Sequence, residues 1–105
     1  GTLYERFRQL VQDCCMKERE VKFYANQLNI SEKYLNVISK QNSGATASEF
    51  IHRFTKERIV LLLQNKNFNI SEISNEMSFS SRSFFTRYVK KVLGCTPSEY
   101  RNRLR

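Results

Sequence analysis

The side chains with the clearest chemistry in this sequence are polar, and they recur at three- and four-residue intervals. They are Ser83, Thr86, Arg87 and Lys90, with Arg82 beside them. The spacing of the first four places them on one face of a helix. An arginine can donate two hydrogen bonds to guanine, a threonine methyl can contact thymine, and a lysine can bind phosphate. Such a face suits the major groove of duplex DNA, although a basic helix face is more often simply solvated.

A helix with one apolar face is expected to carry these side chains. Its apolar residues, at positions i, i+3, i+4 and i+7, are Phe85, Tyr88, Val89 and Val92. Ser80 or Ser81 is placed to cap the start of this helix, and Gly94 is placed to end it. Thr96 and Glu99 predict the start of another helix, because a threonine and a glutamate three residues apart form a capping box.

The same arrangement occurs twice in the chain. Residues 34–50 match residues 84–100 at an offset of fifty, and residues 25–31 match residues 74–80 at an offset of forty-nine. In the match at an offset of fifty, the identical pairs are Lys40/Lys90, Gly44/Gly94, Thr46/Thr96, Ser48/Ser98 and Glu49/Glu99. Each copy predicts a short helix, a turn of three or four residues, and a helix with a polar front. This is the pattern of a helix-turn-helix, whose second helix enters the major groove.

The first copy carries different side chains at the equivalent front positions. They are Lys33, Asn36, Val37 and Lys40. Asn36 can form two hydrogen bonds with adenine, and Val37 can either contact a thymine methyl or fill the core. The lysines better placed for phosphates are Lys40, Lys90 and Lys91. We expect Tyr34 and Phe84 to pack within the protein rather than to stack on bases.

The whole chain predicts an all-α fold of seven helices. The helices are expected at about residues 2–16, 21–28, 32–41, 47–66, 70–77, 82–93 and 97–104. We expect two helix-turn-helix lobes, residues 1–46 and 67–105, joined by a long central linker helix over residues 47–66 that holds them about one DNA turn apart. The middle of the linker, residues 59–63, is apolar on every side and should be covered on several sides. The arginines expected to be exposed on the last helix are Arg101, Arg103 and Arg105.

Composition limits the partner and the compartment. The chain has 105 residues and a net charge of +8, and 11 of its 18 basic but only 4 of its 10 acidic side chains lie in residues 51–105. A basic chain favours an anionic partner, with nucleic acid ahead of a membrane surface. Three cysteines without metal-like spacing indicate reduced thiols in a cytoplasmic protein. We see no apolar run long enough to span a bilayer and no signal-peptide pattern.

Catalytic and metal chemistry find no support in the residue pattern. His52 is the single histidine, and no glycine-rich phosphate loop, pair of catalytic carboxylates or Ser/His/Asp set is present in the sequence. We therefore predict no catalytic residue, no metal site and no cofactor.

The second copy and its flanks resemble a known family. The segments Ile73–Ser80, Ser83–Lys91 and Thr96–Arg101, with Gly94, are similar to the C-terminal signature of the DNA-binding domain of AraC/XylS-type bacterial transcription regulators. The resemblance is looser in the first half and covers about residues 3–103 in all. It implies two helix-turn-helix lobes joined by a long helix and bound to asymmetric promoter sites. It also implies that such a domain is usually the C-terminal part of a longer protein, with an N-terminal sensor or dimerisation domain.

Together with the two polar fronts, the resemblance defines two sets of candidate residues. The candidates for base contacts are Lys33, Asn36, Val37, Arg82, Ser83, Thr86 and Arg87. The candidates for phosphate contacts are Ser31, Lys40, Ser81, Lys90 and Lys91. Ser78 stands where the family commonly has a turn glycine, and a positive φ there would cost a serine about 1 kcal/mol. Val37 stands where arginine is common, so we expect unequal lobes with the second dominating affinity.

The function we expect is sequence-specific binding of double-stranded promoter DNA, with two recognition helices in successive major grooves and no enzymatic activity. The first alternative is a protein-interaction module, in which the weakly charged first lobe contacts RNA polymerase or a sigma factor and DNA binding is weak or unspecific. The second alternative is RNA binding, which the lack of a strand pattern and of a GXXG loop disfavours.

Overall fold

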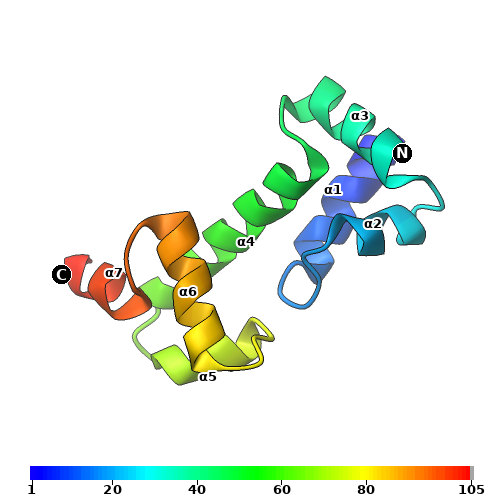
Figure 1. The fold of residues 1–105 in the computed structure, drawn as a ribbon. Coiled ribbons are helices and arrows are strands. Elements are labelled where there is room, and N and C mark those ends of the chain that lie inside the picture. The colour runs from blue at the N-terminus through cyan, green and yellow to red at the C-terminus, as the bar shows by residue number, and fades with distance from the viewer. Residues whose placement is uncertain (105) are drawn as a thin grey trace. The chain divides into compact units, whose positions relative to one another are not determined.

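Seven helices make up residues 1–104, the part of the chain that the computed structural model describes (Figure 1). They are α1 (Leu3–Cys14), α2 (Val21–Gln27), α3 (Glu32–Ser43), α4 (Ala47–Gln64), α5 (Ile70–Glu76), α6 (Arg82–Leu93) and α7 (Pro97–Arg103). No strand occurs in residues 1–104, and the predicted all-α fold is confirmed. The chain divides into two compact units within α4, between Thr55 and Lys56. One helix therefore ends the first unit and begins the second.

The first unit is organised around α3, which packs against α1 and α2 (Figure 1). Its core consists of Phe7, Val11, Cys15, Tyr24, Ala25, Leu28, Leu35, Ala47, Phe50 and Ile51. The centroid of the Phe7 ring lies 5.1 Å from that of Phe50 and 5.9 Å from that of Tyr24. Leu35 anchors α3 in this core with no exposed surface, which leaves the opposite face of α3 to solvent.

The second unit is organised around α6, which packs against α5 and α7 (Figure 1). Its buried apolar residues include Ile59, Leu63, Ile70, Ile73, Met77, Phe85, Val89 and Cys95. Of the apolar face that the periodicity predicts for α6, Phe85 and Val89 are buried, and Tyr88 and Val92 are partly buried. Phe79 supports this helix from the turn, because its ring centroid lies 5.2 Å from that of Phe85 and 5.3 Å from that of Tyr88.

The two units share the same helix ends after their recognition helices. Gly44 and Gly94 end α3 and α6 with φ of 78° and 80°, a left-handed conformation that favours glycine. Both predicted capping boxes are present. The Thr46 N–H donates to Glu49 Oε1 at 2.9 Å and the Glu49 N–H donates to Thr46 Oγ1 at 3.1 Å, and the second unit repeats both distances. The helix that follows each recognition helix therefore starts in the same way.

The expected coverage of the middle of α4 is wrong at one residue. Ile59 and Leu63 are buried, but Leu61 is 61% exposed. The buried pair lies four residues apart and faces the core of the second unit, whereas Leu61 lies between them on the other side of the helix. The apolar residues on every side of this segment therefore did not predict burial on every side, because a helix needs only one apolar stripe to pack.

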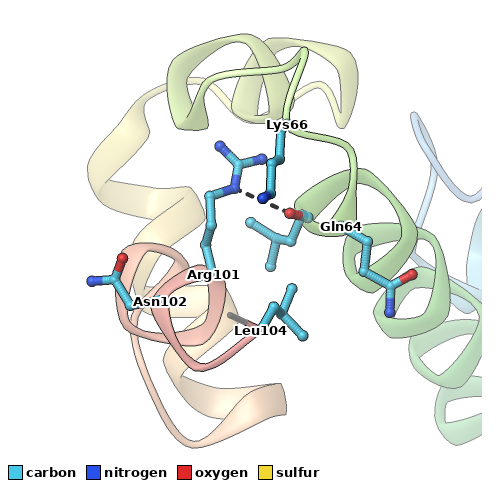
Figure 2. A pocket seen from close by; sticks show the side chains of 6 residues that line it. Gln64, Lys66, Arg101, Asn102 and Leu104 are labelled. Atoms are coloured by element: carbon cyan, nitrogen blue, oxygen red, sulfur yellow. Dashed lines mark hydrogen bonds between the residues drawn. The ribbon is translucent and has the colours of Figure 1, made fainter.

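Arg101 is also not the exposed side chain that we expected. It is partly buried, and its Nε donates to the Leu63 carbonyl at 3.0 Å (Figure 2). Its Nη2 reaches the carbonyls of Leu62 at 3.4 Å and Asn65 at 3.3 Å. A hollow of about 450 Å³ beside it is lined by Leu63, Gln64, Lys66, Arg101, Asn102 and Leu104. The guanidinium satisfies carbonyls at the C-terminal end of α4, which gives Arg101 a structural role. Arg103 is exposed, and Arg105 lies outside the described residues.

Candidate nucleic-acid interface

The turn before each recognition helix has the same backbone conformation. Asn29 and Ser78 have φ of 57° and 61°, which confirms the positive φ expected at Ser78. The Ser78 N–H donates to the Asn75 carbonyl, and the Phe79 N–H donates to the Ser74 carbonyl, both at 3.0 Å. The first lobe repeats the two bonds at 3.2 and 3.0 Å. This pair of bonds is a Schellman ending of the first helix of the motif, and it directs the chain into the second.

The two turns differ in length by one residue. Four residues separate α2 from α3, as predicted, whereas five separate α5 from α6. Ser31 caps α3 and Ser81 caps α6, each through its side-chain oxygen. Ser80 is therefore the additional residue of the second turn, and it accounts for the change of the repeat offset from forty-nine to fifty.

The N-terminal half of α6 brings the polar front of the second lobe together at the surface. Arg82, Ser83 and Arg87 are exposed, and Thr86 is partly buried. These four side chains line one depression of the surface. The Arg82 Nη1 donates to Ser71 Oγ at 3.4 Å and so connects the first turn of α6 to the first turn of α5. The four base-contact candidates of this lobe thus share one continuous surface.

The equivalent front of α3 is exposed at two of its three base-contact candidates. Lys33 is exposed, and Val37 is 42% exposed, so this valine does not fill the core. Asn36 is partly buried, and its Oδ1 accepts a hydrogen bond from the Ala47 N–H at 3.0 Å. This bond connects α3 to the first residue of α4. A two-bond contact to adenine requires Asn36 to share or release it.

The second lobe does not use this connection. Thr86 stands at the position of Asn36, and Pro97 stands at the position of Ala47. Proline has no N–H to donate, and its fixed φ suits the first position of α7. The internal donor that occupies the Asn36 side chain in the first lobe is therefore absent from the second.

The serine candidates for phosphate contact lie at the N-terminal caps of the two recognition helices. Ser31 Oγ accepts from the Tyr34 N–H at 3.0 Å, and Ser81 Oγ accepts from the Phe84 N–H at 3.2 Å. A serine that accepts in this way keeps its own hydroxyl proton to donate. The start of a helix also favours an anion. Both caps are therefore suited to a phosphate oxygen.

The lysine candidates for phosphate contact are exposed near the C-terminal ends of the recognition helices. They are Lys40, Lys90 and Lys91. In each unit, the hydrogen bonds from the capping threonine hold the pKa of Glu49 or Glu99 below its usual 4.5. Nearby cations lower the pKa further, Lys40 for Glu49 and Arg103 followed by Lys90 for Glu99. Both carboxylates therefore stay ionised at neutral pH.

The exposure of two aromatic side chains was not predicted from the sequence. We expected Tyr34 and Phe84 to pack, but they are 50% and 53% exposed at the same position in the first turn of α3 and α6. The guanidinium carbon of Arg87 lies 4.6 Å from the centroid of the Phe84 ring. The signal was in the sequence, because a phenylalanine and an arginine three residues apart are neighbours on a helix and form cation–π contacts.

Other chemistry is sparse in the part of the chain that the structure describes. No group of three or more His, Cys, Asp or Glu side chains in residues 1–104 could hold a metal ion. The cysteines are in the thiol form, with Cys15 and Cys95 buried and Cys14 partly buried. Over the same residues, no helix combines the length and the apolar character needed to cross a membrane.

Comparison with known proteins places most of this chain in one family. The family model described as "Helix-turn-helix domain" matches residues 24–103. The Msm operon regulatory protein of Streptococcus mutans serotype c is 32% identical over 80 residues, which cover 76% of this chain and 29% of that protein. Histidine kinase P4 of Formosa agariphila is 30% identical over 102 residues, which cover 96% of this chain and 7% of that protein. The chain spans less than a third of either relative.

A solved structure has a closely similar fold. The C-terminal domain of AraT, a response regulator from Geobacillus stearothermophilus, aligns with a TM-score of 0.85 and 26% identity, and the match covers 100% of this chain and 87% of that one. The family match also includes both recognition helices, α3 and α6. The chain therefore belongs to the helix-turn-helix domains of the AraC/XylS family, which bind DNA in bacterial regulators of transcription.

Proposed function

We propose that the second lobe is the main reader of base sequence and that the first lobe contributes phosphate contacts and a weaker, partly apolar base contact. The observation that supports this proposal is the difference between the exposed side chains of the two recognition helices. Two arginines, Arg82 and Arg87, are exposed on α6, whereas Lys33 and Val37 are exposed on α3. A bidentate arginine–guanine pair discriminates by about 1–3 kcal/mol against the wrong base. A valine, by contrast, can make only an apolar contact with a thymine methyl.

Within the second lobe, each side chain has a role that its chemistry supports. Arg87 donates two hydrogen bonds to the O6 and N7 atoms of a guanine. Thr86 contacts a thymine methyl beside it, and Ser83 accepts from or donates to a neighbouring base edge. Arg82 lies in the first turn of α6, where it can reach either a base or the phosphate next to the helix start.

The phosphate contacts supply affinity without sequence information. Lys91 and Lys90 on α6 and Lys40 on α3 displace counterions when they bind phosphates. Each such contact steepens the salt dependence of binding by about one unit of the logarithmic slope. The larger basic excess of residues 51–105 adds to the attraction at the second lobe.

Selection from a random duplex DNA library tests this assignment directly. Wild type, Arg87→Ala and Val37→Ala are selected in parallel at about 150 mM salt, where unspecific binding is weak. We expect two enriched patches for the wild type, with the stronger preference in the patch that Arg87→Ala alters. Val37→Ala is the matched control at the equivalent position of the first lobe, and it should weaken the other patch slightly.

Lys91→Ala separates phosphate from base contacts in the same experiment. It should reduce the affinity for all sequences alike and flatten the salt slope by about one unit. If Arg87→Ala also weakens all sequences equally, Arg87 is a phosphate contact and the proposed base reading is wrong.

A second candidate function follows from the apolar character of the first lobe's front. Tyr34 and Val37 lie three residues apart on α3, and each exposes at least two fifths of its surface. Their face can bind a protein partner such as an RNA polymerase subunit while α6 holds the DNA. Partner binding through this face should persist at about 0.5 M salt, where DNA contacts are lost. It should be reduced by Val37→Lys and left unchanged by Arg87→Ala.

The domain supplies DNA binding to a regulator, and we assign no reaction to it. The homologous segment is a small part of a histidine kinase in one relative and a part of an operon regulator in another. Sensing or enzymatic activity would then belong to other domains of the whole protein. We expect the site of action to be the cytoplasm, where a bacterial chromosome lies.

A further inference from the structure

Phe84 is an exposed phenylalanine in the first turn of α6, beside the polar front of that helix. Its side chain is 53% exposed although the adjacent Phe85 is fully buried. Its backbone is held in place, because Ser81 Oγ accepts the Phe84 N–H at 3.2 Å. A fixed backbone and a ring with two rotatable side-chain bonds make Phe84 a rigid apolar surface at the start of the recognition helix.

The Arg87 side chain lies over this surface. Its guanidinium carbon is 4.6 Å from the centroid of the Phe84 ring, well within the range of a cation–π contact. An exposed arginine otherwise samples many rotamers, and binding a base in one orientation costs side-chain entropy. A ring beneath the guanidinium restricts those rotamers before DNA arrives.

We propose that Phe84 is a positioning residue that orients the Arg87 guanidinium for its two-bond contact with guanine. This inference rests on the base-reading role proposed for Arg87. The contact restricts the arginine in the free protein, so the restriction is already in place when the complex forms. This restriction therefore strengthens the two-bond contact of Arg87 with guanine more than it strengthens contacts that do not need both hydrogen bonds.

The first lobe offers a matched comparison for this pair. Tyr34 occupies the position of Phe84 and is exposed to nearly the same extent, at 50%. The residue three positions later is Val37, which has no charge to place over the ring. The aromatic ring is thus present in both lobes, and the aromatic–arginine pair is present in the second.

The test compares discrimination rather than affinity alone. Wild type, Phe84→Leu, Phe84→Tyr and Arg87→Ala are titrated with the selected duplex and with the same duplex changed at the base that Arg87 reads. Phe84→Leu should lower the ratio of the two affinities by about two- to fivefold, the range of an exposed cation–π contact. Phe84→Tyr keeps a π face and should retain the wild-type ratio. Tyr34→Leu, the control in the first lobe, should leave this ratio unchanged.

Proton NMR of the free protein provides a readout that does not depend on DNA. The Arg87 side-chain protons should be shifted upfield by the Phe84 ring current in wild type and in Phe84→Tyr, and the shift should disappear in Phe84→Leu. The amide spectrum checks that each variant is folded.

Each outcome separates the inference from the proposed function on which it rests. If Arg87→Ala lowers the discrimination ratio and Phe84→Leu does not, the positioning role of Phe84 is wrong and the base-reading role of Arg87 stands. If Arg87→Ala leaves the ratio unchanged, both assignments are overturned. If the ring-current shift is missing from the wild type, the contact does not restrict Arg87 in solution and the positioning role is again overturned.

Discussion

The two lobes share a backbone frame and differ in the side chains placed on it. Both have a turn residue in the left-handed region, a glycine after the recognition helix, and a capping box with bonds of 2.9 and 3.1 Å. At the recognition surface, Asn36 and Val37 stand where the second lobe has Thr86 and Arg87. Local backbone requirements are therefore satisfied twice in the same way, while the surface chemistry differs.

The difference extends into the core. Ser39 is fully buried, and its hydroxyl donates to the Ala45 carbonyl at 2.8 Å. The equivalent residue of α6 is Val89, which is also fully buried. Asn36 likewise bonds to the backbone of α4, whereas Pro97 removes the donor from the second lobe. The first lobe thus uses polar side chains to secure its recognition helix, and the second relies on apolar packing.

Truncating the buried anchor of each recognition helix should have the largest effect and test whether the lobes depend equally on apolar packing. Leu35→Ala and Phe85→Ala remove fully buried side chains at equivalent positions. We expect the larger loss for Phe85→Ala, at about 3–5 kcal/mol, and a smaller one within about 2–5 kcal/mol for Leu35→Ala, both measured by urea unfolding. Equal losses would contradict the greater apolar dependence of the second lobe.

Placing an arginine on α3 should reduce the difference between the surfaces. Val37→Arg puts a guanidinium at the position of Arg87, three residues after the exposed Tyr34. We expect a new guanine preference in the patch read by the first lobe, worth about 1–3 kcal/mol in selection or titration. The conservative variant Val37→Ile controls for added bulk. A uniform gain for all sequences would mean that α3 contacts phosphates here.

Removing the Asn36 amide should test the polar attachment of α3. Asn36→Ala leaves the Ala47 N–H without its side-chain acceptor, and we expect a cost of about 1–2 kcal/mol in thermal or urea unfolding. Thr86→Ala at the equivalent position should cost less, because Pro97 has no N–H to satisfy. A larger loss for Thr86→Ala than for Asn36→Ala would reverse this comparison.

Glycine substitutions in the two strained turns should change the free energy of unfolding by different amounts. Ser78→Gly should raise the free energy of unfolding by about 1 kcal/mol, because serine is disfavoured at the observed φ of 61°. Asn29→Gly should gain less, since asparagine tolerates the left-handed region better than serine does. Urea unfolding of both variants measures the difference. Destabilisation by Ser78→Gly would show that the serine side chain contributes more than the strain removes.

Substitutions in the capping boxes should have the smallest effect on stability, and the effect should be the same for both boxes. The pKa of Glu49 and of Glu99 is below the unfolded value of 4.5. Their contribution to stability is therefore fully present above about pH 4.5 and is lost as the pH falls through the lower, folded pKa. Glu49→Gln and Glu99→Gln should each flatten the fall in stability on acidification by a similar amount. Markedly different slopes would show that the two caps are not equivalent in solution.

Much of the fold could be predicted because its determinants are local. The capping threonines, the glycines after α3 and α6 and the apolar periodicity of each helix act within a few residues of one another. The repeat then predicted two helix-turn-helix units. The positive φ at Ser78 was suggested only by the family resemblance, because the family commonly has glycine at that position. The exposure of individual side chains was harder to predict than the helices. Leu61 and Phe84 are apolar residues whose burial depends on what packs beside them.

What the sequence by itself determined was the number and type of the helices, their caps and the chemistry of the two fronts, because these follow from residue type and spacing. The tertiary structure decided how particular polar side chains are used. Arg101 donates to carbonyls 36 to 39 residues earlier in the chain, and Asn36 bonds to a backbone N–H 11 residues later. Neither bond follows from helical periodicity, because each depends on where a second helix ends or begins in space.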